Sequence, residues 1–259
     1  MMKNPTTESP VLAARSALAL ATRSTRHRLG GLSLALAGGI LCAALVAQPA
    51  SAAPTDSMIK SVKFDDVKGV NKLLAEGMDP NLTDQTGTPL LVIAAREKSD
   101  QVAAALIADP KTDIEKLDAA GENAMMLAAL NGDLELVKLL ISKDAEVNKK
   151  GWAPLHYAAS NGNDDIVKLL LDHDAYIDAG SPNGTTPLMM ASRGGHVSTV
   201  KLLLDSGADL NVKNQLGLTA LDFAKQYHAK DVEEGLAARL QSTQQAPAAA
   251  PAAPQNSAK

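Results

Sequence analysis

Histidine and the acidic residues are the side chains of this sequence best suited to acid–base or metal chemistry. Beyond residue 52 the chain has four histidines: His156, His173, His196 and His228. No two of them have the spacing of metal ligands on one helix face. The histidines therefore predict no metal site.

Acidic side chains gather between Asp172 and Asp178, where the sequence reads Asp-His-Asp and then a further Asp. A calcium loop counted from Asp172 needs Gly where Ile177 stands and Glu where Asn183 stands, so this reading fails. The sequence also has no Gly-rich phosphate loop and no G-x-S-x-G motif. We therefore predict no catalytic residue, no cofactor and no bound metal.

Composition favours packed helices over a sheet. Hydrophobic residues make up 46% of the chain and aromatic residues only 2%, so the apolar content is largely Ala and Leu. Residues 1–52 contain five basic residues and one acidic residue; subtracting them from 25 and 29 leaves 20 and 28, a net charge of about −8. An acidic body without a Lys/Arg block argues against nucleic acid and against an anionic membrane surface as partners.

The N-terminus has the pattern of an export signal. A basic stretch at 23–28 precedes an uncharged apolar run at 29–47, which ends at Ala50-Ser51-Ala52. This order predicts a secretory signal peptide over residues 1–52, cleaved after Ala52, and a periplasmic or secreted protein that does not contact the membrane after cleavage. Two alternatives remain open: an uncleaved membrane anchor, since the run could marginally span a bilayer, and a mitochondrial transit peptide.

Cys42 is the single cysteine and lies inside the apolar run. Leu41 before it is too large for a lipoprotein signal, so we expect Cys42 to be removed with the leader. The mature chain then has no disulfide, no thiol nucleophile and no cysteine metal ligand.

The rest of the chain repeats itself. Near copies of one helical segment recur at residues 70–77, 136–144, 166–174 and 199–207, and each is followed by a polar stretch and a glycine. These glycines are Gly87, Gly121, Gly151, Gly184 and Gly217, with spacings of 34, 30, 33 and 33. A period near 33 indicates stacked supersecondary units.

Two units, which begin with Ala153-Pro154-Leu155-His156 and Thr186-Pro187-Leu188-Met189, resemble the ankyrin repeat most clearly. The resemblance covers about residues 56–240. The resemblance implies an all-α solenoid of helix-turn-helix units joined by β-hairpin-like fingers. It also implies that His156 and His196 make local structural hydrogen bonds.

Local chemistry agrees with that expectation. Thr186 suits an N-cap and Pro187 the first turn of a helix. Val200, Leu203 and Leu204 form an apolar face, and Gly207 suits a left-handed helix end. Asp144 and Asp174 replace that glycine in two units, which we expect to be less stable for this reason.

About six units fit residues 53–240, the first and last being polar caps of the array. From Gln241 to Lys259 the Ala/Pro-rich sequence has no periodic apolar face and is expected to be disordered. We expect a monomer.

The resemblance implies that a protein partner binds in the groove between fingers and first helices. Candidate contact residues on that side are Leu130, Asn131, Tyr157, Ser160, Met190, Arg193 and Tyr227. The finger before Gly151 is three residues shorter than its neighbours, which should leave a notch, and the single Trp152 follows that glycine.

The role of Trp152 can be interpreted in two ways: it covers apolar surface beside the short finger, or it anchors the partner together with Tyr157. The function that the sequence favours is a non-catalytic, exported scaffold or inhibitor. An envelope-tethered structural protein, and a groove that binds a small ligand or catalyses a reaction, are the alternatives.

Overall fold

The computed structural model describes the backbone of residues 54–245 and the side chains of residues 54–242. In this range the chain forms α2 (Pro54–Lys63), α3 (Val67–Ala75), α4 (Leu90–Glu97), α5 (Asp100–Ala108), α6 (Ala124–Asn131), α7 (Leu134–Ile141), α8 (Pro154–Asn161), α9 (Asp164–Asp172), α10 (Pro187–Gly194), α11 (Val197–Asp205), α12 (Ala220–Gln226) and α13 (Lys230–Gln245). Of these described helices, none is long and apolar enough to cross a membrane. The predicted signal peptide, with Cys42, lies outside the described residues.

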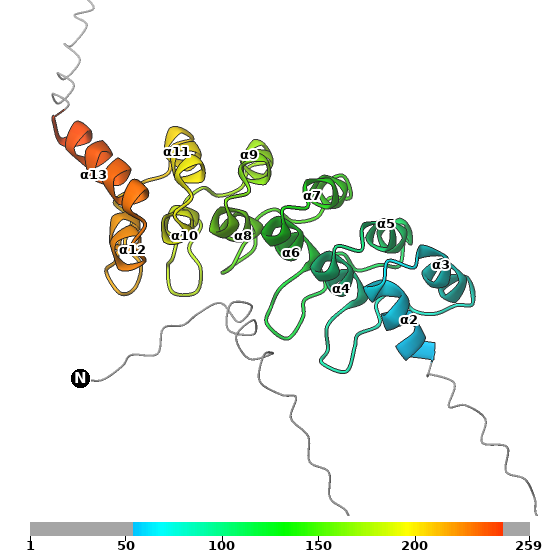
Figure 1. The fold of residues 1–259 in the computed structure, drawn as a ribbon. Coiled ribbons are helices and arrows are strands. Elements are labelled where there is room, and N and C mark those ends of the chain that lie inside the picture. The colour runs from blue at the N-terminus through cyan, green and yellow to red at the C-terminus, as the bar shows by residue number, and fades with distance from the viewer. Residues whose placement is uncertain (1–53, 246–259) are drawn as a thin grey trace, which may run out of the picture. The chain divides into compact units, whose positions relative to one another are not determined.

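The helices form two layers. The first helices of the units, α2, α4, α6, α8, α10 and α12, pack side by side in what we call the inner row, and α3, α5, α7, α9, α11 and α13 form the outer row. Each inner helix also packs on the outer helix that follows it, and Figure 1 shows both rows advancing together along the stack. The predicted all-α repeat solenoid is confirmed.

The inner helices are apolar almost all round because neighbours cover them on both sides. In α6 every residue from Ala124 to Ala129 is buried. The pairs Ala94–Ala95, Ala128–Ala129 and Ala158–Ala159 are fully buried, and their small size lets adjacent helices approach closely. The outer helices bury one stripe only: in α11, Val200 and Leu203 are buried together with Thr199, whereas Leu204 is half-buried.

Caps and turns define the helix ends. The Thr186 side chain accepts a hydrogen bond from the Met189 N–H at the start of α10, and Pro187 occupies the first turn. Gly207 ends its unit with φ 101°, and Asp144 and Asp174 take the same left-handed position with φ 61°. The expected conformations of these five residues are therefore observed.

The C-terminal boundary of the fold differs from the sequence prediction. Disorder was expected from Gln241, but α13 continues to Gln245. Gln and Ser are tolerated in a helix, and the first strong stop is Pro247, which disfavours helical backbone at the residue before it. The remainder of the predicted tail lies outside the described residues.

Candidate functional site on the finger side

The candidate site is the side of the stack where the fingers meet the inner helices. Four long fingers, before α4, α6, α10 and α12, end in a similar turn, and Figure 1 shows them descending beside the inner row. In the first of these turns the Asp84 N–H donates to the Thr88 carbonyl at 2.9 Å, and the Gly87 N–H donates back to the Asp84 carbonyl at 3.0 Å. The same two bonds recur at Asp118, Ser181 and Asn214. Only one isolated β-bridge, Thr83 with Pro89, forms in the described fingers, so they are turns more than ribbons.

The side chain at the start of these turns fixes their conformation. Asp84 accepts from the N–H groups of Thr86 and Thr88 at 2.8 and 3.0 Å. Burial raises the pKa of the Asp84 carboxyl, but the hydrogen bond from the Thr86 hydroxyl and these two backbone bonds outweigh it and hold the pKa below its usual value. The fingers are therefore ordered locally.

The finger before α8, residues 145–153, is built differently, and we call it the short finger. Asn148 makes the bonds to the next unit that Asn81 makes earlier: its Nδ2 donates to the Asp174 carbonyl and its Oδ1 accepts from the Tyr176 N–H, both at 2.8 Å. The turn glycine Gly87 comes six positions after Asn81, whereas Gly151 comes only three positions after Asn148. Among the described residues the two turn bonds have no counterpart in the short finger.

An ion pair holds the short finger to its predecessor instead. Lys149 Nζ lies 2.6 Å from Glu115 Oε2 and 3.1 Å from Glu146 Oε2. Burial disfavours the charged lysine, but the two carboxylates outweigh it and raise the pKa of Lys149. This contact connects the side chains of neighbouring fingers.

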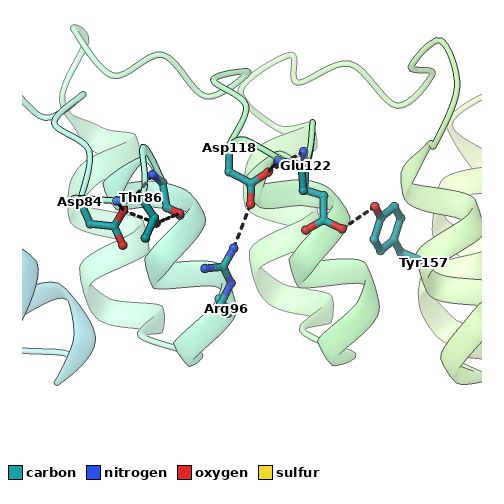
Figure 2. Close-up of polar contacts among 8 residues, drawn as sticks. Asp84, Thr86, Arg96, Asp118, Glu122 and Tyr157 are labelled. Carbon is teal, nitrogen blue, oxygen red and sulfur yellow. Dashed lines mark hydrogen bonds and ion pairs between the residues drawn. The ribbon is translucent and has the colours of Figure 1, made fainter. Parts of the chain in front are cut away.

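A row of polar side chains crosses three inner helices at the base of the fingers (Figure 2). The Arg96 guanidinium at the end of α4 lies 2.9 Å from Asp118 Oδ2, and the Tyr157 hydroxyl on α8 donates to Glu122 Oε1 at 2.8 Å. Glu122 is only 1% exposed, and its Oε2 has no hydrogen-bond partner among the described residues. Burial raises the pKa of Glu122, more than the Tyr157 hydrogen bond lowers it.

Trp152 lies next to this row. Its ring meets the rings of His156 and Tyr157 edge-on, with centroids 5.3 and 6.3 Å apart, and it is half-buried. Trp152 and Glu122 occupy equivalent positions, directly after the turn glycines Gly151 and Gly121. Thr88 and Thr185 hold that place in two other units.

His156 is a structural residue in this fold. Its Nδ1 accepts from the Ala153 N–H at 3.1 Å and its Nε2 donates to the Thr185 carbonyl at 3.0 Å. Complete burial lowers the pKa of His156 to about 4, more than the backbone hydrogen bonds raise it. His196 similarly contacts the Ser160 carbonyl at 3.1 Å. In the described part of the chain no three His, Cys, Asp or Glu side chains gather in a way that could hold a metal ion.

The predicted contact residues divide into two groups. Leu130, Ser160 and Arg193 are half-buried on the inner row, and Tyr227 is 39% exposed after α12. Arg193 lies over the Tyr227 ring at 4.9 Å, and Phe223 stacks on the same ring. Asn131 uses its Nδ2 to bind the Ala95 carbonyl of the preceding unit.

Tyr157 and Met190 are buried, each 5% exposed. They occupy the same position of α8 and α10, and the side chain at this position points into the stack. Tyr157 and Met190 are therefore buried packing residues and do not lie on the surface. Sequence reasoning missed Arg96, Asp118 and Glu122. The available signal was an acid at 122 where two other units have Thr.

Comparison with known proteins agrees with this architecture. A family model of ankyrin repeats in three copies matches residues 58–150 and 91–181, and a model of the single ankyrin repeat matches residues 183–215. Together these ranges cover more than half of the chain.

Curated relatives are similar to this chain over part of its length. A putative ankyrin repeat-containing protein of Treponema pallidum is 33% identical over 96 residues, which is 37% of this chain and 32% of that protein. Palmitoyltransferase AKR1 of Lachancea kluyveri is 33% identical over 34% of this chain and 13% of its own length. Alpha-latroinsectotoxin-Lt1a of Latrodectus tredecimguttatus is 37% identical over 32% of this chain and 6% of its own length. The chain thus spans at most about a third of these relatives, and the family models identify it: it belongs to the ankyrin-repeat family.

Proposed function

We propose that this chain is an exported, non-catalytic binding protein, a scaffold or inhibitor that holds a protein partner on the finger side of its repeats. Ankyrin repeats are generally protein–protein interaction modules, and the fold is typically non-catalytic. Export, the partner and its role are the new parts of this proposal.

One observation carries the choice of surface. The seventh residue of each inner helix from α4 to α12 is partly or fully exposed, and the five units place four kinds of side chain there: Arg96, Leu130, Ser160, Arg193 and Gln226. Most buried positions of the same helices have small, aliphatic or methionine residues, and His156 and Tyr157 of α8 are exceptions. Packing dictates the residue types at the buried positions but not those of the exposed row, and this supports the row as the surface that meets a partner.

The test is capture of a partner from the native envelope fraction with the full chain, followed by measurement of its affinity. A defined protein that binds saturably supports the proposal. Turnover of a small substrate with no protein bound would contradict it.

Export is tested separately by mass spectrometry of the purified native protein. A mature N-terminus at Ala53 agrees with a cleaved signal and a soluble periplasmic or secreted protein. An intact N-terminus in a membrane fraction would favour the tethered alternative.

A further inference from the structure

Glu122 is an unusual residue for its place in the repeat. The residue after the turn glycine is Thr88, Trp152, Thr185 or Leu218 in the other units, all of them uncharged. Glu122 is a long acid at that place, and at 1% exposure it is as buried as the core. An ionised carboxylate in such a place is costly unless it is paired.

The pairing of Glu122 is half complete. Oε1 accepts from the Tyr157 hydroxyl, but Oε2 has no partner among the described residues. The nearby cation, Arg96, already binds Asp118 at 2.9 Å. Figure 2 shows Glu122 with Tyr157 on one side and the Arg96–Asp118 pair on the other. One buried carboxylate oxygen of Glu122 therefore lacks a hydrogen-bond donor within residues 54–242.

The segment beside Glu122 is the part of the finger row least constrained by its own hydrogen bonds. The short finger is three residues shorter between Asn148 and Gly151, and it has neither turn bond of the long fingers. Its base presents the half-buried Trp152, edge-on to Tyr157, which in turn binds Glu122. The half-buried Trp152 ring and the underpaired carboxylate of Glu122 are thus connected through Tyr157, which contacts both of them.

We propose that Glu122 and Trp152 form a recognition site for an arginine side chain of the protein partner. This inference rests on the proposed function and names the chemistry of the partner at that surface. A guanidinium can donate to Glu122 Oε2 through one edge while its plane lies against the aromatic ring of Trp152. Residues 53–259 carry a net charge of about −8, from 20 basic and 28 acidic residues, which favours a cationic partner segment.

The chain contains its own reporter, because Trp152 is its only tryptophan. The full chain is titrated with the peptide acetyl-Gly-Arg-Gly-amide while Trp152 fluorescence is followed. The same peptide with citrulline, which has the shape of arginine without its charge, and the same peptide with lysine are the comparisons. We expect a saturable change with arginine, at least tenfold weaker binding of citrulline, and weaker binding of lysine.

Variants locate the site. Glu122→Gln keeps an acceptor for Tyr157 and removes the charge, and we expect it to weaken arginine binding at least tenfold. Glu97→Gln is the control, since it removes one exposed acid from the end of α4, and should leave binding unchanged. In the unmodified protein, the NMR signal of the Trp152 indole N–H should move with arginine and stay in place with citrulline, a result that does not depend on any variant folding.

Equal responses to arginine and citrulline, or unchanged binding by a folded Glu122→Gln variant, would overturn the site. An equal response to lysine would overturn the assignment of arginine. If a native partner is captured equally well by the wild type and by Glu122→Gln, the proposed function stands and this inference fails. If no protein is captured while the peptide still binds at Glu122, the proposed function fails and the site stands.

Discussion

His156 should make the stability of this protein fall as the pH drops from neutral, and removing it should remove that dependence. The imidazole is fully buried between Ala153 and Thr185, and its pKa in the fold is about 4 against 6.5 for an ordinary histidine. Below pH 6.5 the unfolded chain takes up a proton at His156 while the folded chain does not. Stability from the neutral ring is therefore complete above pH 6.5 and is lost as the pH approaches 4.

The size of the effect follows from the pKa difference. Between 6.5 and about 4 the shift corresponds to about 3 kcal/mol of unfolding free energy, at roughly 1.36 kcal/mol per unit. The raised pKa of Glu122 acts in the opposite direction, because its carboxyl is easier to protonate in the fold than in the unfolded chain. A comparison of two variants at each pH is therefore needed to isolate His156.

His156→Gln is the matched variant, because an amide has one acceptor for the Ala153 N–H and one donor for the Thr185 carbonyl, yet does not titrate. Urea unfolding of both proteins, followed by circular dichroism and Trp152 fluorescence, is measured from pH 7 to pH 4. We expect the wild-type advantage to shrink by about 3 kcal/mol over that range. A stability difference that stays constant with pH, or an NMR titration of His156 with a pKa near 6.5, would contradict the lowered pKa of His156.

Three further predictions concern single positions. Asp174→Gly relieves a left-handed Asp and should raise the unfolding free energy by roughly 0.5–1 kcal/mol, while Gly207→Asp should lower it in the same urea assay. Asp133→Asn should stabilise by about 1 kcal/mol, because the buried Asp133 Oδ2 has no hydrogen-bond partner among the described residues, whereas Asn163 at the equivalent place donates to two carbonyls; loss of stability would contradict this. Trp152→Ala should weaken partner binding at least tenfold by isothermal calorimetry; unchanged affinity with a lowered melting temperature would make Trp152 purely structural.

The helical array could be predicted because each unit repeats the same local sequence features. Pro187 after Thr186 starts a helix, the Ala pairs permit close packing, and the turn glycines recur at nearly constant spacing. Because five units show the same pattern at nearly the same spacing, the fold could be predicted without knowledge of any contact. The end of α13 was less predictable, because Gln241–Gln245 has neither an apolar stripe nor a strong helix stop.

The candidate site was only partly predictable, because burial on the inner row depends on neighbouring units. Tyr157 was expected on the surface, yet its hydroxyl reaches Glu122, 35 positions earlier in the chain. The Arg96–Asp118 pair likewise joins two units across 22 positions. Periodicity gives the place of a residue within its unit, but not which side chain of the next unit it meets.

The fold also shows how the sequence's one asymmetry is accommodated. The short spacing before Gly151 predicted a short finger, and the structure supplies the contact that supports it, Lys149 to Glu115. Neither Lys149 nor Glu115 has a motif that marks it. Such pairs are found only when neighbouring fingers are placed side by side.

The most direct measurement of the central claim is capture of the native partner with two matched variants of the full chain. Leu130→Arg and Ser160→Arg together change the finger side at positions where α4 and α10 already have arginine, so the fold tolerates them. Ala104→Arg and Ser198→Arg together add the same charge to exposed positions of the outer row. We expect the first pair to abolish capture and the second pair to leave it intact; loss of capture by the outer-row pair alone would contradict binding on the finger side.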